Sequence, residues 1–223
     1  MALAIATSPA TVSGNTVANV TTASFTPPNN SLLVACLGVQ FERVMTLTNS
    51  GAALAWTKRR ETNTNSYTAI FTAPLVTGRA LTVTATPDSA VSLGMKLFVV
   101  TGADLVNPVG AVGGGGAAGA TASTTVTAYT STTANSLGIG VADEFLAGTV
   151  STGADATGFP FRIVDQTSGV MLYKNAATAT PGTGVTMTFN GSGAANYVWA
   201  WSAIEILPVP VITPFTGWGV PIK

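Results

Sequence analysis

The chain has 223 residues, a formal net charge of zero, and charges on only 8% of its residues. Nucleic-acid binding needs a basic surface, so this composition argues against nucleic acid as a partner. One cysteine and no histidine exclude an intrachain disulfide, Ser-His-Asp and Cys-His catalysis, and histidine-ligated zinc. The length suits one large all-β domain or two small ones. So little charge provides weak repulsion between copies, which favours self-association.

Short runs rich in Val, Thr, Ile and Phe, separated by Gly, Pro, Asn and Asp, predict an all-β fold. No ten-residue stretch combines helical apolar spacing with a cap. The opening MALAIATSPA lacks the basic region of a signal peptide. No apolar stretch approaches the ~20 residues of a membrane helix, so no membrane insertion is expected.

The first strong strand signal is LLVACLGV, an almost unbroken apolar run that follows the turn residues PPNNS. Cys36, inside this run, is interpreted as a small core residue. In LTVTAT, residues 81–86, apolar residues alternate with threonines, as in a half-buried antiparallel strand. Strands of the first half are expected near 31–39, 55–61, 66–73, 80–86 and 94–101.

The second half repeats the first. TTANSLGIGVADE, residues 132–144, matches the turn and strand at 26–39, and VTMTF, residues 185–189, alternates like LTVTAT. Strands of the second half are expected near 136–142, 160–165, 169–175, 184–189 and 197–206. The offset between matching strands is about 103 to 105 residues throughout. The chain therefore predicts two similar five-strand halves, at about 25–104 and 130–207.

Each half has one apolar face to bury. The halves either face each other as one two-sheet, jelly-roll-like β-sandwich, or each closes on itself and the two sit in tandem. Because each half has few large core side chains, the single sandwich over residues 1–207 is favoured. The expected core residues are Leu33, Leu81, Val83, Leu97, Val99, Val185, Met187 and Ile204.

The glycine-rich stretch at about 110–125 is interpreted as the connection between the halves, either a linker or a long crossing loop. Its GGGG run, residues 113–116, is not followed by Lys-Ser/Thr and does not match a phosphate-binding loop. Lys58–Arg60 is the one basic cluster. It is interpreted as a solvated strand rim, with a contact to an acidic partner as the alternative.

The carboxylates form no clear catalytic pattern. Asp143 and Glu144 are adjacent on a strand and point to opposite faces, so they do not make the carboxylate pair of a glycosidase. Nothing in the sequence indicates that Asp143 converges with Asp165 or Glu205. Calcium at a loop mouth is a minor alternative. We expect no enzyme activity, no catalytic residues, no cofactor and no metal.

One strand, NYVWAWSAIEI, carries an aromatic face made of Tyr197, Trp199 and Trp201. Such a face can stack against sugar rings, as in many β-sandwich carbohydrate binders. The matching strand of the first half carries Lys96 at the position of Trp199, which indicates a face that is not always buried. The favoured interpretation is that another segment covers the tryptophans; the alternative is a binding site for a host surface glycan.

The final stretch, PVPVITPFTGWGVPIK at 208–223, is apolar and contains four prolines, unlike a polar disordered tail. Prolines lower the entropy that an extended segment loses on docking. We predict a C-terminal arm that docks on its own sandwich or on a neighbour. The expected partner-binding residues are Phe215, Trp218, Val220 and Ile222.

Several stretches carry a family resemblance: FTPPNNSLLVACLGV, LAWTKRRE, YTAIFTAPL, LTVTAT and KLFVVTGADLVNPVG. They resemble accessory structural proteins of tailed bacteriophages, notably those of actinobacteria, over about 20–207. The ending FTGWGVPI is also similar to phage tail-gene products. Members are usually described as minor tail proteins and sometimes as head-decoration proteins. The resemblance implies a β-sandwich virion component without a cofactor, and it supplies no catalytic residues.

The favoured function is therefore that of a bacteriophage virion structural protein, in first place a minor tail component. It would act by contacts with other tail or capsid proteins and with its own copies. Decoration of the capsid is the alternative within the same class. A carbohydrate-binding module is the alternative from another class. Copy number per virion separates the first two, because shell decoration needs hundreds of copies and a tail tip only a handful.

Overall fold

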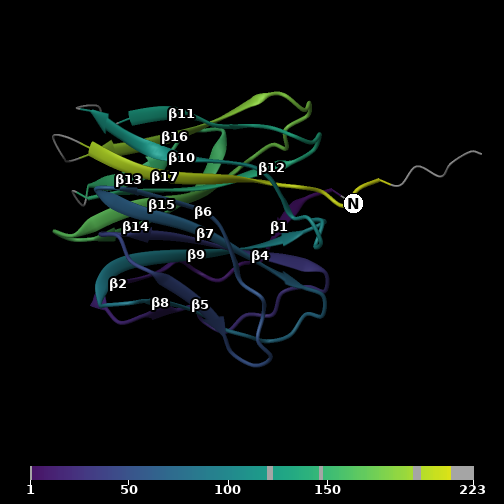
Figure 1. Cartoon of the computed structure of the whole chain (residues 1–223), viewed down its shortest axis with the longest axis horizontal. Coiled ribbons are helices and arrows are strands. Elements are labelled where there is room, and N and C mark those ends of the chain that lie inside the picture. The colour runs from purple at the N-terminus through teal and green to yellow at the C-terminus, as the bar shows by residue number, and fades with distance from the viewer. Residues whose placement is uncertain (1, 120–122, 146–147, 193–196, 212–223) are drawn as a thin grey trace, which may run out of the picture.

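The structure is a computed structural model that describes residues 2–119, 123–145, 148–192 and 197–211. Every regular element in these ranges is a β-strand, and all strand pairs are antiparallel (Figure 1). The all-β sandwich architecture predicted from the turn-punctuated Val/Thr-rich runs is confirmed. None of the described residues forms a helix with the length and hydropathy needed to cross a membrane.

The first half contains a large and a small sheet. The first large sheet has the order β1 (Ala4–Ala6), β9 (Val91–Thr101), β4 (Ser31–Val39), β7 (Ser66–Leu75) and β6 (Thr57–Thr64), with β2 (Val12–Val17) also paired to β9. The first small sheet has the order β3 (Val20–Thr21), β8 (Val83–Pro87) and β5 (Met45–Asn49).

The second half is built in the same way. The second large sheet has the order β10 (Val109–Gly119), β17 (Tyr197–Ile206), β12 (Leu137–Glu144), β15 (Thr167–Lys174) and β14 (Ala156–Ile163). The second small sheet has the order β11 (Ser123–Thr130), β16 (Gly184–Ser192) and β13 (Thr149–Thr152).

The two halves therefore share one strand order. In the large sheets β9, β4, β7 and β6 correspond to β17, β12, β15 and β14, and in the small sheets β3, β8 and β5 correspond to β11, β16 and β13. The turns repeat as well: Asn30 and Asn135, just before β4 and β12, both have positive φ, 54° and 61°. Each half has more strands than the five predicted. The additional strands are hard to recognise in the sequence, because they are short (β1, β2, β3, β5 and β13), threonine-rich (β11) or glycine-rich (β10).

The number of layers differs from the prediction of a single two-sheet sandwich. Each half closes on itself, with its small sheet over one face of its large sheet, and the two large sheets then pack face to face (Figure 1). Three apolar cores result: one inside each half and one between the halves. All eight predicted core residues are buried.

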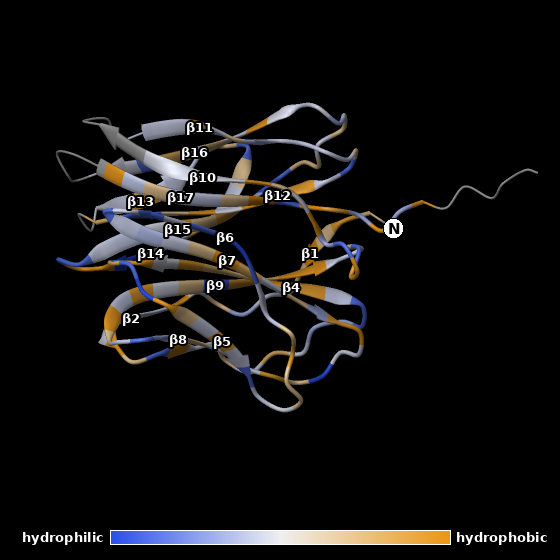
Figure 2. Cartoon of the chain, in the orientation of Figure 1, coloured by the Kyte–Doolittle hydropathy of each residue, from blue (hydrophilic) through white to orange (hydrophobic). Residues whose placement is uncertain are grey.

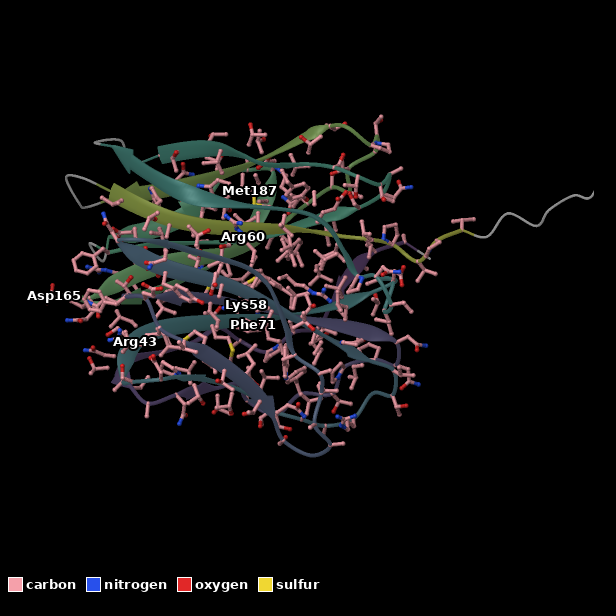
Figure 3. All side chains as sticks on the ribbon, viewed as in Figure 1. Arg43, Lys58, Arg60, Phe71, Asp165 and Met187 are labelled. Carbon is pink, nitrogen blue, oxygen red and sulfur yellow. The ribbon has the colours of Figure 1, made fainter. Side chains whose placement is uncertain are left out.

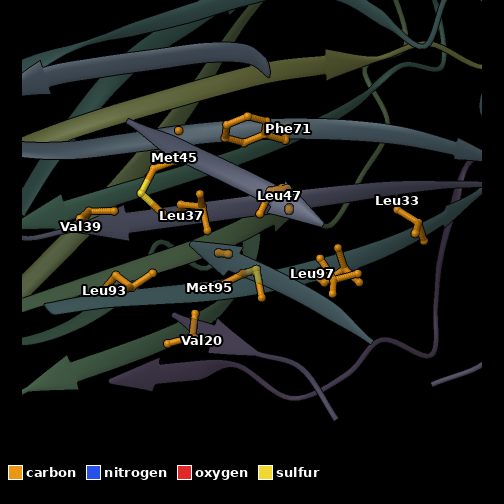
Figure 4. Packing of buried hydrophobic residues seen from close by; sticks show 14 of the residues in the cluster. Val20, Leu33, Leu37, Val39, Met45, Leu47, Phe71, Leu93, Met95 and Leu97 are labelled. Carbon is orange, nitrogen blue, oxygen red and sulfur yellow. The ribbon is translucent and has the colours of Figure 1, made fainter. Parts of the chain in front are cut away.

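Strand β4 shows why four layers form. All nine of its residues are buried. Leu33, Leu37 and Val39 face the first small sheet, as Figure 4 shows, while Leu32 and Cys36 belong to the core between the halves. A strand covered on both faces reads as a continuous apolar run, which explains LLVACLGV and its hydrophobic colour in Figure 2. The interpretation of Cys36 as a core residue is confirmed.

The glycine run at 113–116 lies within strand β10, and the prediction of a linker or loop at about 110–125 is wrong for this part. Added to Gly113, a Cβ would lie 1.6 Å from the carbonyl oxygen of Ala128 on β11. Added to Gly114, it would lie 2.5 Å from Nε of Arg60 on β6. Glycine in a strand often marks close approach of another chain segment, and β10 is approached on both faces.

Hydroxyl groups cross between the two large sheets beside the apolar core. The Oγ1 of Thr68 lies 2.9 Å from Oγ of Ser202, and Oγ of Ser66 donates to the carbonyl of Asp143 at 2.9 Å. At the sheet edge, Nη2 of Arg60 donates to the carbonyl of Gly114 at 3.2 Å (Figure 3). Of the basic cluster, only Lys58 is exposed, whereas Arg59 and Arg60 are half-buried, so the rim interpretation holds for Lys58 and not for Arg60.

Candidate functional site

The aromatic face of β17 is covered. Trp199 is 1% exposed and Trp201 is 8% exposed, and both belong to the core between the second large and small sheets. The ring of Trp199 packs against Phe189 of β16 at a centroid distance of 6.0 Å. Sugar stacking needs an open ring face, so the glycan-platform hypothesis is wrong for these two residues. The side chain of Tyr197 lies outside the described residues.

Strand pairing explains the error. Trp201 lies opposite Ala142 on β12, and in the first half Met95 lies opposite Leu37 on β4. Met95, like Trp201, faces its small sheet. The sequence match placed Lys96 at the position of Trp199, but the strand pairing gives Leu93, which lies opposite Val39 as Trp199 lies opposite Glu144. Leu93 faces the first small sheet, whereas Lys96 lies on the other face of its strand. The sequence match was therefore shifted by three residues along the strand, and a shift by an odd number of residues moves a side chain to the opposite face of a sheet.

The acidic side chains do not converge. Glu205 lies opposite Gly138, five residues along β12 from Asp143, which is roughly 17 Å at 3.4 Å per residue. Asp165 lies in the turn between β14 and β15, at the end of the molecule away from the C-terminal segment (Figure 3). Within the described ranges no group of three or more His, Cys, Asp or Glu residues is placed to hold a metal ion.

Asp143 is fully buried and faces the first half. Its Oδ1 accepts a hydrogen bond from Thr167 Oγ1 at 2.7 Å, whereas its Oδ2 has no hydrogen-bond partner among the described residues. A Cβ on Gly38 of β4 would lie 2.7 Å from that oxygen, so the carboxyl fills space left by a glycine. Burial, together with the neighbouring Glu144, raises the pKa of Asp143 well above its usual value.

A pH prediction follows from the raised pKa of Asp143. Between the unfolded and the folded pKa, the native state holds a proton that the unfolded chain has lost. The free energy of unfolding should therefore fall as pH rises from about 4 toward neutrality, by at most about 1.4 kcal/mol per pH unit for one group. Asp143→Asn cannot titrate and should reduce that slope, measured by urea unfolding at a series of pH values. Equal slopes in the two proteins would show that Asp143 ionises normally.

Glu205 is also buried, but its hydrogen-bond donors shift its pKa in the opposite direction from that of Asp143. Its Oε2 accepts hydrogen bonds from the backbone N–H of Ala111 at 2.9 Å and from Oγ1 of Thr132 at 2.7 Å. Burial opposes ionisation, but these donors outweigh it and hold the pKa of Glu205 below its usual value. The carboxylate thus ties β10 and the turn before β12 to the end of β17, which is a structural role.

Lys96 is buried between the halves. Its Nζ donates to the carbonyl of Pro9 at 2.5 Å and lies 4.3 Å from the ring centroid of Phe159. Burial lowers its pKa. A carbonyl and an aromatic face partly replace the lost water around the ammonium group. Lys96 therefore links the N-terminal segment, β9 and β14, and its contacts are those of a packing residue.

Two grooves lie at the end of the molecule where the C-terminal segment leaves the fold. The first groove, about 730 Å³, lies between the turn at 28–30 and residues 101–105. The second groove, about 720 Å³, lies between the turn at 133–135 and residues 207–211. Nearby, Val209 is 45% exposed and Val211 is 83% exposed. The predicted partner-binding residues Phe215, Trp218, Val220 and Ile222 lie outside the described residues, directly after this end.

Comparison with known protein families, curated proteins and solved structures finds no match. The geometry at the C-terminal end therefore carries the functional argument. The sequence prediction named the arm but missed the grooves beside it. The sequence signal that could have indicated the grooves is the repeated turn, PPNNS and TTANS. Its two copies form equivalent walls of the two grooves.

Proposed function

We propose that this chain is a structural protein of a tailed-bacteriophage virion, in first place a minor tail component, and that it acts through assembly contacts. Decoration of the capsid is the second candidate in the same class. The resemblance of the strand and turn motifs to virion accessory proteins supports this assignment, as does the low charge of the chain. The burial of Trp199 and Trp201 removes the main support for a glycan-binding module.

The observation that supports the proposal is an apolar C-terminal segment whose first residues are hydrogen-bonded to the fold. Residues 207–209 are hydrogen-bonded to the fold: the N–H of Val209 donates to the carbonyl of Gly102 at 3.0 Å, and that of Asp104 donates to Leu207 at 3.0 Å. Residues 212–223 contain Phe215 and Trp218 but only one charged side chain, Lys223. An apolar segment held at one end of a body is suited to binding another subunit.

The direct test is mass spectrometry of purified particles with labelled reference peptides from this chain. We expect the chain in the particle, at a handful of copies for a tail component or at hundreds for decoration of the shell. Its absence from purified particles would contradict the proposal.

Removal of residues 212–223 should separate folding from assembly. The chain is cut after Val211, because the hydrogen bonds to the fold extend to Val209 and should be kept. The shortened protein should keep the circular dichroism spectrum and the melting temperature of the full chain within about 2 °C, since no described core residue is removed. It should nevertheless be lost from particles. Normal incorporation of the shortened protein would show that the segment makes no essential contact.

A further inference from the structure

The segments that follow the last strand of each half pair with each other. Residues 101–105 follow β9, and residues 207–211 follow β17. Ala103 forms an antiparallel bridge with Pro208, and the N–H of Leu207 donates to the carbonyl of Pro108 at 2.9 Å. Together the two segments form a central ridge, and the two grooves lie on either side of it. Asp104 and Val209 border both grooves.

The two grooves are equivalent under the internal repeat. In each, one wall is the turn before the central strand of the large sheet, with Asn30 or Asn135 at positive φ. The other wall is the ridge segment that follows the last strand of the same half, β9 or β17. Their volumes, about 730 and 720 Å³, are also nearly equal. The duplication therefore produced two copies of one groove at one end of the molecule.

The lining suits an extended, mainly apolar ligand with few charges. It consists mainly of Ala, Leu, Val and Pro side chains with Asn and Thr at the turns, and Asp104 is its one charged residue. Residues 212–223, ITPFTGWGVPIK, have the complementary composition: several large apolar side chains and one cation, Lys223. Fully extended, twelve residues reach roughly 40 Å, enough to leave one body and enter a groove on the next.

A second copy is a better source of this segment than the same chain. Residues 207–211 already form a wall of the second groove, so the following residues would have to reverse direction at once to enter it. Pro214 disfavours a helical reversal at residue 213, because proline keeps the residue before it out of the α region. Val211, at the edge of the groove, is exposed.

We propose that the two grooves are a duplicated docking site for residues 212–223 of a second copy of this chain. Trp218 or Phe215 fills the apolar floor, and Lys223 approaches Asp104. The donor segment and the acceptor groove are different surfaces, so the contact is heterologous and builds a ring or a chain of subunits. This inference rests on the proposed assembly function and specifies the partner.

Cross-linking in the full chain tests the partner and the site together. A photoreactive amino acid replaces Trp218, and the ¹⁵N-labelled and unlabelled proteins are mixed in equal amounts before irradiation. We expect mixed-isotope products that join position 218 to peptides containing 28–30, 101–105 or 133–135. Products of one isotope only would place the segment on its own chain. Products on other surfaces, or a wild-type protein that stays monomeric at about 100 µM, would overturn the inference.

A matched pair of variants tests the groove without touching the segment. Val209→Asp places a carboxylate at the border of both grooves, whereas Val106→Asp places one nearby at a position that is 85% exposed and lines neither groove. By sedimentation velocity, Val209→Asp should weaken self-association at least tenfold, and Val106→Asp should leave it unchanged. Equal effects of the two substitutions on self-association would contradict the grooves as the docking site. If removal of 212–223 abolishes particle incorporation while Val209→Asp does not weaken self-association, the proposed function stands and the groove is not the receptor.

Discussion

Replacing Trp199 with alanine is expected to lower the free energy of unfolding by about 3–5 kcal/mol, the usual cost of removing a buried large aromatic side chain. The indole is 1% exposed and packs against Phe189 across the second large and small sheets. The cavity would lie between β17 and β16, where both strands pair with neighbours on either side and cannot easily close the gap. Urea unfolding monitored by far-ultraviolet circular dichroism measures this change.

The control for Trp199→Ala is Phe41→Ala. Phe41 is 43% exposed and makes one ring contact, with Phe145 at 5.5 Å. Its loss should change the free energy of unfolding by about 1 kcal/mol or less, because little apolar area returns to water. A Trp199→Ala protein as stable as the wild type would contradict the buried position of this residue. It would also reopen the interpretation of β17 as an exposed aromatic platform.

The second large effect is expected from Gly113→Ala. The new Cβ would lie 1.6 Å from the carbonyl oxygen of Ala128, and that neighbour is backbone, which cannot rotate away. Strands β10 and β11 must then separate, which disturbs the junction between the second large and small sheets. We expect a loss of at least about 3 kcal/mol, or no folded protein, as for severe overpacking. The measurement is again urea unfolding, with the soluble yield recorded.

Gly115→Ala is the matched control, two residues along the same glycine run. The atoms nearest to a Cβ at Gly115 belong to the Trp201 ring, at 3.4 Å or more, which is ordinary contact. Alanine also reduces the entropy of the unfolded chain relative to glycine, so the change should lie within about 1 kcal/mol of the wild type. If the run were a flexible linker, both substitutions would be neutral. Their difference therefore tests whether 113–116 is a packed strand.

The sequence pattern predicted the fold class and most of the core. In β8 and β16 the alternation of apolar residues with threonine identified the buried faces, because successive side chains of a strand point to opposite sides. The repeat was visible because its turn and strand motifs return in the same order. The Asn-Ser pairs at 30–31 and 135–136 mark the same left-handed turn in both halves.

The candidate site was predicted only in part. The apolar and proline-rich composition of 208–223 predicted a docking segment without any structure, and this stays a prediction. The grooves escaped the sequence because each is assembled from distant segments, such as residues 28–30 with residues 101–105. The cover over the tryptophans escaped the sequence for a related reason: β17 shows which residues share a face, but not that β16 covers it.

By itself, the sequence determined that this protein is all-β, internally duplicated and apolar at its C-terminal end, because these properties depend on local periodicity and composition. Only the tertiary structure decided that there are four sheets, that the glycine run is a strand and that Trp199 is buried. Each of these depends on what lies opposite a residue. In this chain the opposite surface is often distant in sequence, as for Thr68 and Ser202, which are 134 residues apart. Local patterns record which face of a strand is apolar, and long-range packing decides what covers it.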